Sequence, residues 1–136
     1  MDERERTVRA YNAACSSDIA ADIMAFFTPD AVIYDLNHPP VVGREAIGAF
    51  WAKVRARWGG ATWATDHVVS DGRTVVAEWT MHGVSTGQGD APFAFRGADV
   101  FVFAGPLISE IRQYWRFDPA RLDSGLVGYA YPLVER

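Results

Sequence analysis

The chain of 136 residues is 49% hydrophobic and 22% charged and carries a net charge of −4, the length and composition of one globular domain over residues 1–136. The negative balance argues against nucleic acid as the main partner, and the single Cys15 excludes an internal disulfide and a cysteine metal cluster. The charged segment Met1–Arg6 is unlike a signal peptide and no apolar run approaches about 18 residues, so we expect a cytoplasmic protein without a membrane span.

Helices are predicted in the first part of the chain. Residues 2–15 read as a helix because apolar side chains recur on one stripe, at Val8, Tyr11 and Cys15. Ser17 and Asp18 are good N-cap residues for a second, shorter helix. Residues 28–30 end that helix, and a short apolar strand over residues 31–35 follows.

A third helix is the most regular of the three. It follows a Pro-rich loop over residues 37–40, begins at Gly43 and ends at Gly59–Gly60. Its apolar face has helical spacing and consists of Ile47, Phe50, Trp51, Val54 and Trp58.

The second half of the chain is predicted to be a sheet. Four β segments are expected, at residues 61–70, 74–86, 93–104 and 107–117. Asp71-Gly72 is a hairpin signal and Ala104–Pro106 is another turn. Short connections between long strands indicate an antiparallel meander, and helices followed by such a sheet indicate an α+β fold.

The alternation of side chains along the strands selects candidate pocket residues. Asp99 shares a strand face with aromatic residues, Phe101 and Phe103. A carboxyl buried there would have a raised pKa and, as the neutral acid, could donate a hydrogen bond. On the preceding strand we expect Trp79 and Met81 to face the pocket and His82 to face away. On the last strand one face carries Ile111, Gln113, Trp115 and Phe117, and the other Glu110, Arg112 and Tyr114.

Four segments resemble the nuclear transport factor 2-like (NTF2-like) and SnoaL-like superfamily, in particular its ketosteroid isomerase branch. Gly43–Trp51 is similar to the family's third helix, and Ala31–Asp35 to the strand that carries its catalytic Asp. Ala98–Phe103 is similar to the strand with its oxyanion-hole Asp, and Ile111–Trp115 to its last strand. The resemblance covers about residues 5–117. It implies a cone-shaped, curved antiparallel sheet that encloses a hydrophobic pocket together with three N-terminal helices.

The resemblance also implies site residues. Asp35 would be the general base, while Tyr11, which precedes it by the family's spacing, and protonated Asp99 would donate hydrogen bonds to an enolate oxygen. A buried Asp whose raised pKa keeps it neutral, so that it can donate a hydrogen bond, is the established case of ketosteroid isomerase. The extra Tyr hydroxyls that support the oxyanion-hole Tyr in such enzymes are replaced here by Phe27 and Trp51. The expected substrate-binding residues are Trp115, Trp79, Phe50, Trp51, Phe27, Phe101 and Met81.

The resemblance leaves several functions open. The first is a cofactor-free isomerase of a hydrophobic, steroid-like ketone. A cyclase or dehydratase of a polyketide or terpenoid would use the same residues. The third is a binding module that catalyses no reaction. For each of these functions we expect a homodimer that forms through the outer sheet face, which carries Glu110, Arg112 and Tyr114. We expect no metal site, because His38, His67 and His82 lack ligand spacing.

Overall fold

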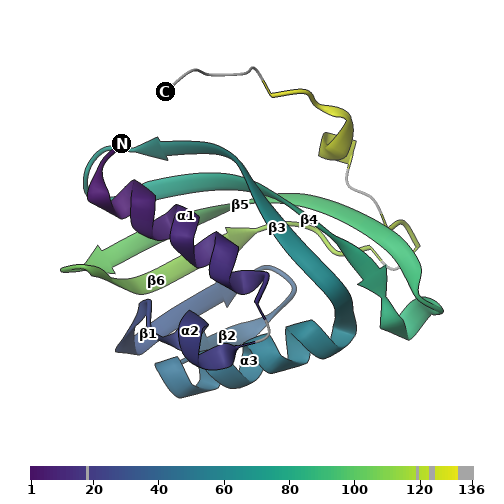
Figure 1. Cartoon of the computed structure of the whole chain (residues 1–136), viewed down its shortest axis with the longest axis horizontal. Coiled ribbons are helices and arrows are strands. Elements are labelled where there is room, and N and C mark those ends of the chain that lie inside the picture. Colours follow the sequence, from purple (N-terminus) through teal and green to yellow (C-terminus); the bar gives the residue numbers. More distant parts are fainter. Residues whose placement is uncertain (18, 119, 123–124, 132–136) are drawn as a thin grey trace.

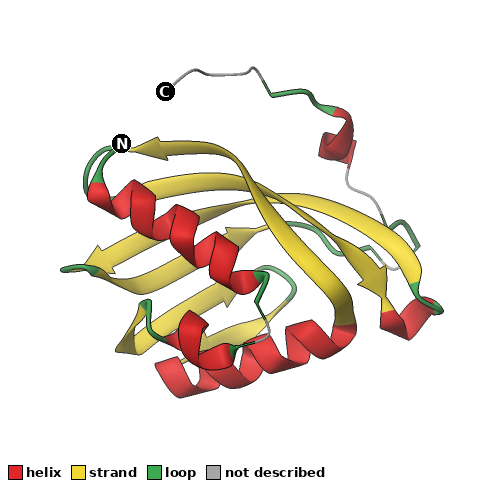
Figure 2. Ribbon diagram, in the orientation of Figure 1, coloured by secondary structure: helices red, strands yellow, loops and turns green. Residues whose placement is uncertain are grey.

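One six-stranded sheet bends around three helices (Figure 1). The computed structural model describes residues 1–17, 19–118, 120–122 and 125–131. The elements, in chain order and coloured by type in Figure 2, are α1 (Glu3–Cys15), α2 (Ala20–Met24), β1 (Phe27–Asp35), β2 (His38–Val42), α3 (Arg44–Arg57), β3 (Trp58–Ser70), β4 (Val75–Ser85), η1 (Thr86–Gln88), β5 (Ala91–Ala104), β6 (Leu107–Tyr114) and η2 (Gly125–Gly128). This confirms the predicted α+β cone.

The helices form where the apolar stripes predicted them. Asp2 caps α1 by accepting a hydrogen bond from the Glu5 amide at 2.8 Å, and the stripe through Tyr11 is buried. The second helix differs from the prediction, because α2 begins only at Ala20 and has no side-chain cap. The Ser17 hydroxyl instead accepts from the Ile19 amide at 3.0 Å, and Asp18 lies outside the described residues.

The sheet has the strand order β2-β1-β6-β5-β4-β3. The run from β3 to β6 is the predicted antiparallel meander. One pairing differs, because β1 lies parallel to β6 and inserts the N-terminal hairpin beside the last strand of the meander. A residue next to the end of β1 therefore faces residues about 80 positions later in the chain.

Three predicted boundaries were wrong. The stretch expected to be a loop forms β2, in which Pro39 and Pro40 are tolerated because β2 is an edge strand that leaves one side unpaired. The stop expected at residues 28–30 lies inside β1, where the register with β6 is interrupted. Trp58 was assigned to the third helix, but it opens β3 and is buried against Phe93.

Two hydrophobic clusters fill the concave side of the sheet. The larger one joins α1, α2 and α3 to the sheet and includes Val8, Tyr11, Ile23, Ile47 and Phe101. The smaller one lies where β3, β4 and β5 extend beyond the helices and includes Trp58, Trp79, Met81, Phe93 and Phe95. Trp115 and Phe117 pack on this second cluster, so it consists largely of aromatic rings.

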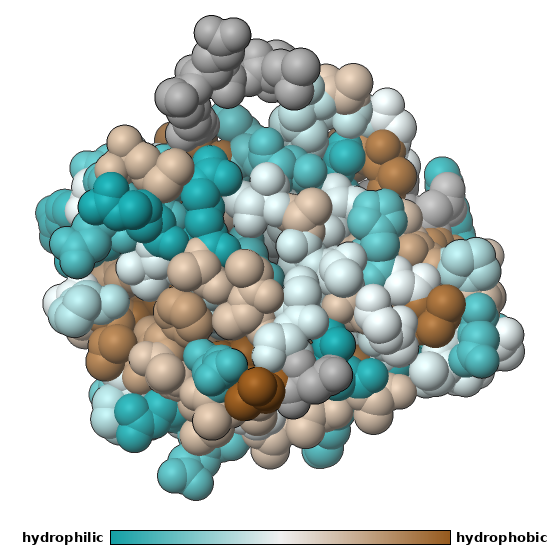
Figure 3. All heavy atoms as spheres, viewed as in Figure 1, coloured by the Kyte–Doolittle hydropathy of each residue, from teal (hydrophilic) through white to brown (hydrophobic). Residues whose placement is uncertain are grey.

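The outer face of the sheet is more polar. Glu110 and Arg112 pair with each other there, and Tyr114 is half-exposed. Figure 3 shows strongly hydrophobic residues only as separate small patches among hydrophilic ones on the face in view. The predicted homodimer contact through the outer face stays a prediction. Among the described residues, no helix is long and apolar enough to cross a membrane.

The C-terminal segment is attached to this outer face by polar contacts. The Arg96 guanidinium donates to the carbonyl oxygens of Leu126 and Tyr129 and lies over the Tyr131 ring. The Tyr131 hydroxyl donates to Glu78. Carbonyl and hydroxyl groups make the attachment, since the side chains of Leu126 and Tyr129 are exposed.

A glycine on the concave face makes room for two tryptophans. A Cβ placed on Gly97 would lie 2.7 Å from the Trp115 Cβ and 2.7 Å from the Trp79 ring. Carbon atoms do not approach so closely, and the Trp115 Cβ is fixed by its backbone. The close approach of β5 to both indoles therefore requires glycine at this position.

We predict that Gly97→Ala destabilises the fold by about 1–3 kcal/mol, the usual cost of overpacking a core. Chemical denaturation of the variant would measure this loss. Gly87→Ala is the matched control, because its Cβ would meet only the Arg57 side chain at 3.5 Å. Equal stability of the two variants would show that the two indoles move aside freely.

Candidate active site

A small cavity with aromatic walls lies between α3 and the concave face of the sheet, at the boundary of the two clusters. Its volume is about 40 Å³, room for little more than one water molecule. We call it the aromatic cavity; it is lined by Asp35, Phe50, Trp51, Val54, Trp58, Trp63, Trp79, Met81, Gln113 and Trp115. Apart from the indole N–H groups, its polar side chains are Asp35 and Gln113. These two are therefore the candidate reactive groups of the cavity.

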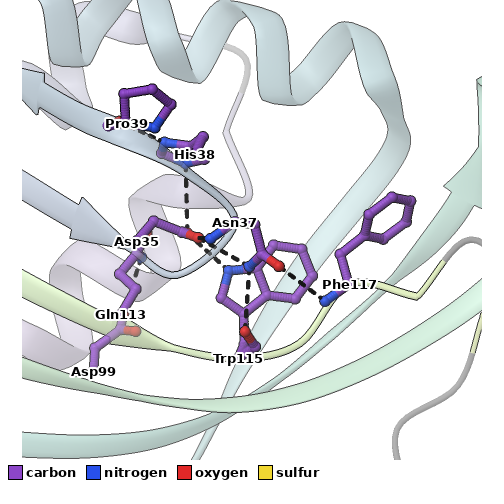
Figure 4. Close-up of polar contacts among 8 residues, drawn as sticks. All are labelled: Asp35, Asn37, His38, Pro39, Asp99, Gln113, Trp115 and Phe117. Atoms are coloured by element: carbon purple, nitrogen blue, oxygen red, sulfur yellow. Dashed lines mark hydrogen bonds and ion pairs between the residues drawn. The ribbon is translucent and has the colours of Figure 1, made fainter.

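The Asp35 carboxylate is buried and firmly held. Its side chain is 3% exposed. Oδ2 accepts a hydrogen bond from the Trp115 indole at 2.7 Å, and Oδ1 accepts from the Asn37 amide and side chain at 2.8 and 2.9 Å (Figure 4). Three N–H donors therefore fix the position of this side chain. The sequence placed Asp35 at the end of a strand, and the structure adds that it faces an aromatic wall.

Asn37 connects the turn after β1 to the chain after β6. Its side-chain nitrogen donates to the Trp115 carbonyl at 3.2 Å, and its side-chain oxygen accepts from the Phe117 amide at 3.1 Å. Figure 4 shows both contacts beside the Asp35 carboxylate. The turn and the Trp115 backbone are therefore held in one arrangement, which fixes the indole that binds Asp35.

His38 stands on the other side of Asp35. Its Nε2 lies 3.5 Å from Asp35 Oδ2, and its Nδ1 lies 2.9 Å from the Pro39 carbonyl oxygen. The ring packs on Phe50 with centroids 4.9 Å apart. The sequence analysis excluded His38 as a metal ligand but assigned it no place at the base.

Asp99 lies in one row with Asp35 across three strands. Asp35 is paired with Gln113, and Gln113 with Asp99, so the two acids stand about 10 Å apart at the usual strand spacing. Gln113 Nε2 donates to Asp99 Oδ2 at 3.3 Å, while Asp99 Oδ1 has no hydrogen-bond partner. The Trp79 indole lies next to this carboxyl without a hydrogen bond of ordinary geometry.

Burial dominates the protonation of Asp99. Burial, with a smaller contribution from the Asp35 charge, raises the pKa of this carboxyl to about 7 against the lowering effect of Trp79 and Gln113. Asp99 is therefore largely a neutral acid below pH 7. The prediction of a buried, protonation-shifted Asp on this face is confirmed.

Tyr11 lies deeper in the core than the sequence suggested. It is 1% exposed, and its ring packs edge-on against Phe26, Phe27, Trp51 and Phe101. Its hydroxyl makes no hydrogen bond. Burial raises the pKa of this phenol well above its usual value, so it stays neutral.

The structure brings together some of the predicted site residues and separates others. Asp35 and the predicted binding residues Phe50, Trp51, Trp79, Met81 and Trp115 line the aromatic cavity. Phe27 and Phe101 belong to the larger cluster instead. Tyr11 and Asp99 are buried behind the cavity walls rather than on them. Their role as donors to a substrate oxygen stays a prediction.

Sequence reasoning missed several residues of the cavity. Gln113 was assigned to the inner face with Trp115, but its place between the two acids follows only from the parallel pairing of β1 with β6. Asn37 carried a local signal, since an Asp followed two residues later by Asn is typical of a side-chain-capped turn. The remaining lining residues, Val54, Trp58 and Trp63, had no signal beyond being apolar.

Two indole N–H groups of the cavity wall have no partner. Trp51 and Trp79 are 4% and 3% exposed, and their Nε1 atoms are buried without a hydrogen bond. An unpaired buried donor costs about 1–3 kcal/mol. The Trp51 indole lies close to the Tyr11 hydroxyl and the Trp79 indole close to the Asp99 carboxyl, without hydrogen bonds of ordinary geometry.

A larger hollow lies on the outer face of the sheet. It has a volume of about 450 Å³ and extends from β5 to η2. Its central charged side chains are already engaged, since Arg96 holds the C-terminal segment and Glu78 contacts His67 and Tyr131. The aromatic cavity, although smaller, is the one lined by both Asp35 and the indoles of Trp51 and Trp79. Within the described ranges, no group of three or more His, Cys, Asp or Glu residues could hold a metal ion.

Solved structures with the same architecture are numerous. A protein with a ketosteroid isomerase-like fold from Catenulispora acidiphila, in complex with trimethylamine, has a TM-score of 0.76 and 21% identity over 85% of this chain and 88% of that one. An NTF2-like protein from Anabaena variabilis has a TM-score of 0.73 and 20% identity over 90% and 91% of the two chains. A putative SnoaL-like polyketide cyclase from Jannaschia has a TM-score of 0.68 and 18% identity over 82% and 85%.

These identities show a shared fold and nothing about a shared reaction. No protein with a curated function matches the sequence. The family model of the SnoaL-like domain matches residues 8–111, which includes the second half of α1, all of α2 and α3, and both Asp35 and Asp99. The chain therefore belongs to the SnoaL-like domain family.

Proposed function

We propose that this protein is an acid–base catalyst that removes a proton from the carbon beside the carbonyl of a small hydrophobic ketone. The observation that carries the proposal is the Asp35 carboxyl group, buried at the wall of the aromatic cavity and held in place by three N–H donors. This carboxyl group borders the space that a bound ketone would enter. It is suited to act as a general base.

The substrate oxygen would bind opposite the base. Trp51 and Trp79 supply the unpaired indole N–H groups of the cavity wall. Donors that await a partner cost no reorganisation when an enolate oxygen forms. Asp99 supports this side by holding the Gln113 amide in place, and as a neutral acid it does not repel the developing negative charge.

The enolate has two productive outcomes. Return of the proton at another carbon gives the isomerisation expected from the ketosteroid isomerase resemblance. Attack of the enolate carbon on a second carbonyl gives a ring, the type of reaction named for the SnoaL-like cyclase of similar fold. Both begin with the same proton transfer. The small volume of the cavity means that either substrate must displace aromatic side chains to enter.

We predict that Asp35→Asn abolishes proton abstraction and leaves binding intact. The measurement is the exchange of the α protons of 2-tetralone, a small hydrophobic ketone, in D₂O by proton NMR. Loss of a general base costs about 10²–10⁴-fold in rate. Binding of 2-naphthol, a planar enol analogue, would be followed by the quenching of tryptophan fluorescence.

Asp30→Asn is the matched control for this test. Asp30 belongs to the same strand but is exposed to solvent, so its loss should leave exchange unchanged. If the wild-type protein binds 2-naphthol but exchanges no faster than buffer, the protein is a binding module and the catalytic proposal is wrong.

We predict that Trp79→Phe weakens 2-naphthol binding by about tenfold. The substitution keeps an aromatic ring in the wall and removes only the N–H, and a hydrogen bond to an oxygen contributes about 1–1.5 kcal/mol. Isothermal titration calorimetry would measure the change. Tyr129→Phe, at an exposed position outside the cavity, serves as the control. Unchanged affinity would exclude the Trp79 indole as the oxygen-binding donor.

The raised pKa of Asp99 predicts a dependence of stability on pH. The folded protein binds this proton more tightly than the unfolded chain, so the contribution of Asp99 is most favourable below about pH 4 and declines as pH rises to about 7. Three pH units at about 1.4 kcal/mol each give about 4 kcal/mol. Asp99→Asn should remove this decline. The free energy of unfolding of each protein would be measured by urea denaturation at pH 4.5 and at pH 8. The difference between the wild-type and variant values should change between the two pH values, and a difference that stays constant would contradict the raised pKa of Asp99.

A further inference from the structure

We propose that His38 is the proton-relay partner of Asp35. In this role it accepts the proton that Asp35 takes from the substrate and passes it to water. The inference rests on the proposed function, because it assigns a route to the proton that the reaction removes. Three features of the contact between Asp35 and His38 carry it.

The first feature is the tautomer of His38. Nδ1 lies 2.9 Å from the Pro39 carbonyl oxygen. A carbonyl oxygen can only accept a hydrogen bond, so Nδ1 carries a proton in this contact. In the neutral imidazole the other nitrogen, Nε2, is then a bare lone pair. That lone pair lies 3.5 Å from Asp35 Oδ2.

The second feature is that Asp35 Oδ2 and His38 Nε2 face each other as two acceptors with no hydrogen between them. Asp35 has three N–H donors on about four lone-pair positions, two on Oδ1 and one on Oδ2. The remaining lone pair belongs to Oδ2, the oxygen beside His38. Nε2 is itself buried without a hydrogen bond. Two acceptors therefore stand side by side, and one added proton turns them into a hydrogen-bonded pair.

The third feature is a gradient of exposure from the base to the solvent. The Asp35 side chain is 3% exposed and the His38 side chain 29%. Pro39, which holds the Nδ1 proton, is exposed on the edge strand β2. Figure 4 shows His38 on the side of Asp35 away from Gln113 and Asp99. His38 thus lies between the buried carboxylate and water.

The proton balance follows directly. The α C–H bond of the ketone breaks, its electron pair becomes the enolate, and the proton joins Asp35 Oδ2. The proton then moves to the lone pair of His38 Nε2, which restores the carboxylate and forms an imidazolium. The imidazolium exchanges its proton with water, and the same route in reverse returns a proton from His38 through Asp35 to a carbon of the enolate. No electrons leave the system and no further reactant is needed.

The surroundings of His38 favour a relay over a purely structural role. Its ring contacts the charged Asp35 side chain, the Pro39 carbonyl and the Phe50 ring. The two other histidines are placed differently. His67 pairs with Glu78 on the outer face, and His82 is exposed.

The test compares wild-type protein with His38→Ala and, as a matched control, His82→Ala. The α-proton exchange of 2-tetralone in D₂O is measured with and without added imidazole. We expect His38→Ala to lose about tenfold or more of the exchange rate, imidazole to restore most of it, and His82→Ala to behave as wild type. Binding of 2-naphthol should be equal in all three proteins.

The outcomes separate the relay from the proposed function. If wild-type protein shows no exchange above buffer, the proposed function fails and the relay fails with it. If wild-type protein exchanges and His38→Ala exchanges equally fast, only the relay is wrong. Loss of exchange without imidazole rescue, or together with loss of 2-naphthol binding, would assign His38 a structural role and also overturn the relay.

Discussion

The carboxylate of Asp35 connects parts of the chain that are far apart in sequence. It lies at the end of β1, accepts from Asn37 in the following turn and accepts from the indole of Trp115, 80 residues later. Buried charges are retained only when donors surround them. The position of Trp115 therefore depends on this carboxylate, and Gly97 allows the indole to reach it by leaving the space that a side chain would fill. The aromatic cavity exists where these constraints meet.

Behind that cavity the core contains polar atoms that the fold leaves unsatisfied. The Tyr11 hydroxyl, the Trp51 and Trp79 indoles and one oxygen of Asp99 are all buried without hydrogen bonds. Each such atom costs stability, and a core built only for stability would replace them with apolar groups. Trp51 and Trp79 line the aromatic cavity, and Tyr11 and Asp99 lie behind these two indoles. His38 shows the same pattern on the opposite side, where an acceptor is kept available for a proton.

The parallel pairing of β1 with β6 is the topological step that assembles this site. It sets Asp35, Gln113 and Asp99 in one row across three strands. An antiparallel hairpin between neighbours in the chain could not do so, because the residues belong to the first and the last two strands. The Gln between the two acids separates their carboxyl groups and donates a hydrogen bond to Asp99.

The sequence alone determined the helices, the meander and the family resemblance, because these depend on local spacing of apolar residues and on turn chemistry. It also identified Asp35 and Asp99, and alternation along β4 placed Trp79 and Met81 on the inner face. The positions predicted for β2 and Trp58 were wrong. Prolines indicated a loop where an edge strand forms, and the glycines after Trp58 indicated a helix end where a buried strand begins. Only the tertiary structure decided that Tyr11 is enclosed by rings, that Gln113 separates the acids and that His38 and Trp115 flank Asp35. These are contacts between residues distant in the chain, and they follow from strand register and side-chain packing, which no local pattern encodes.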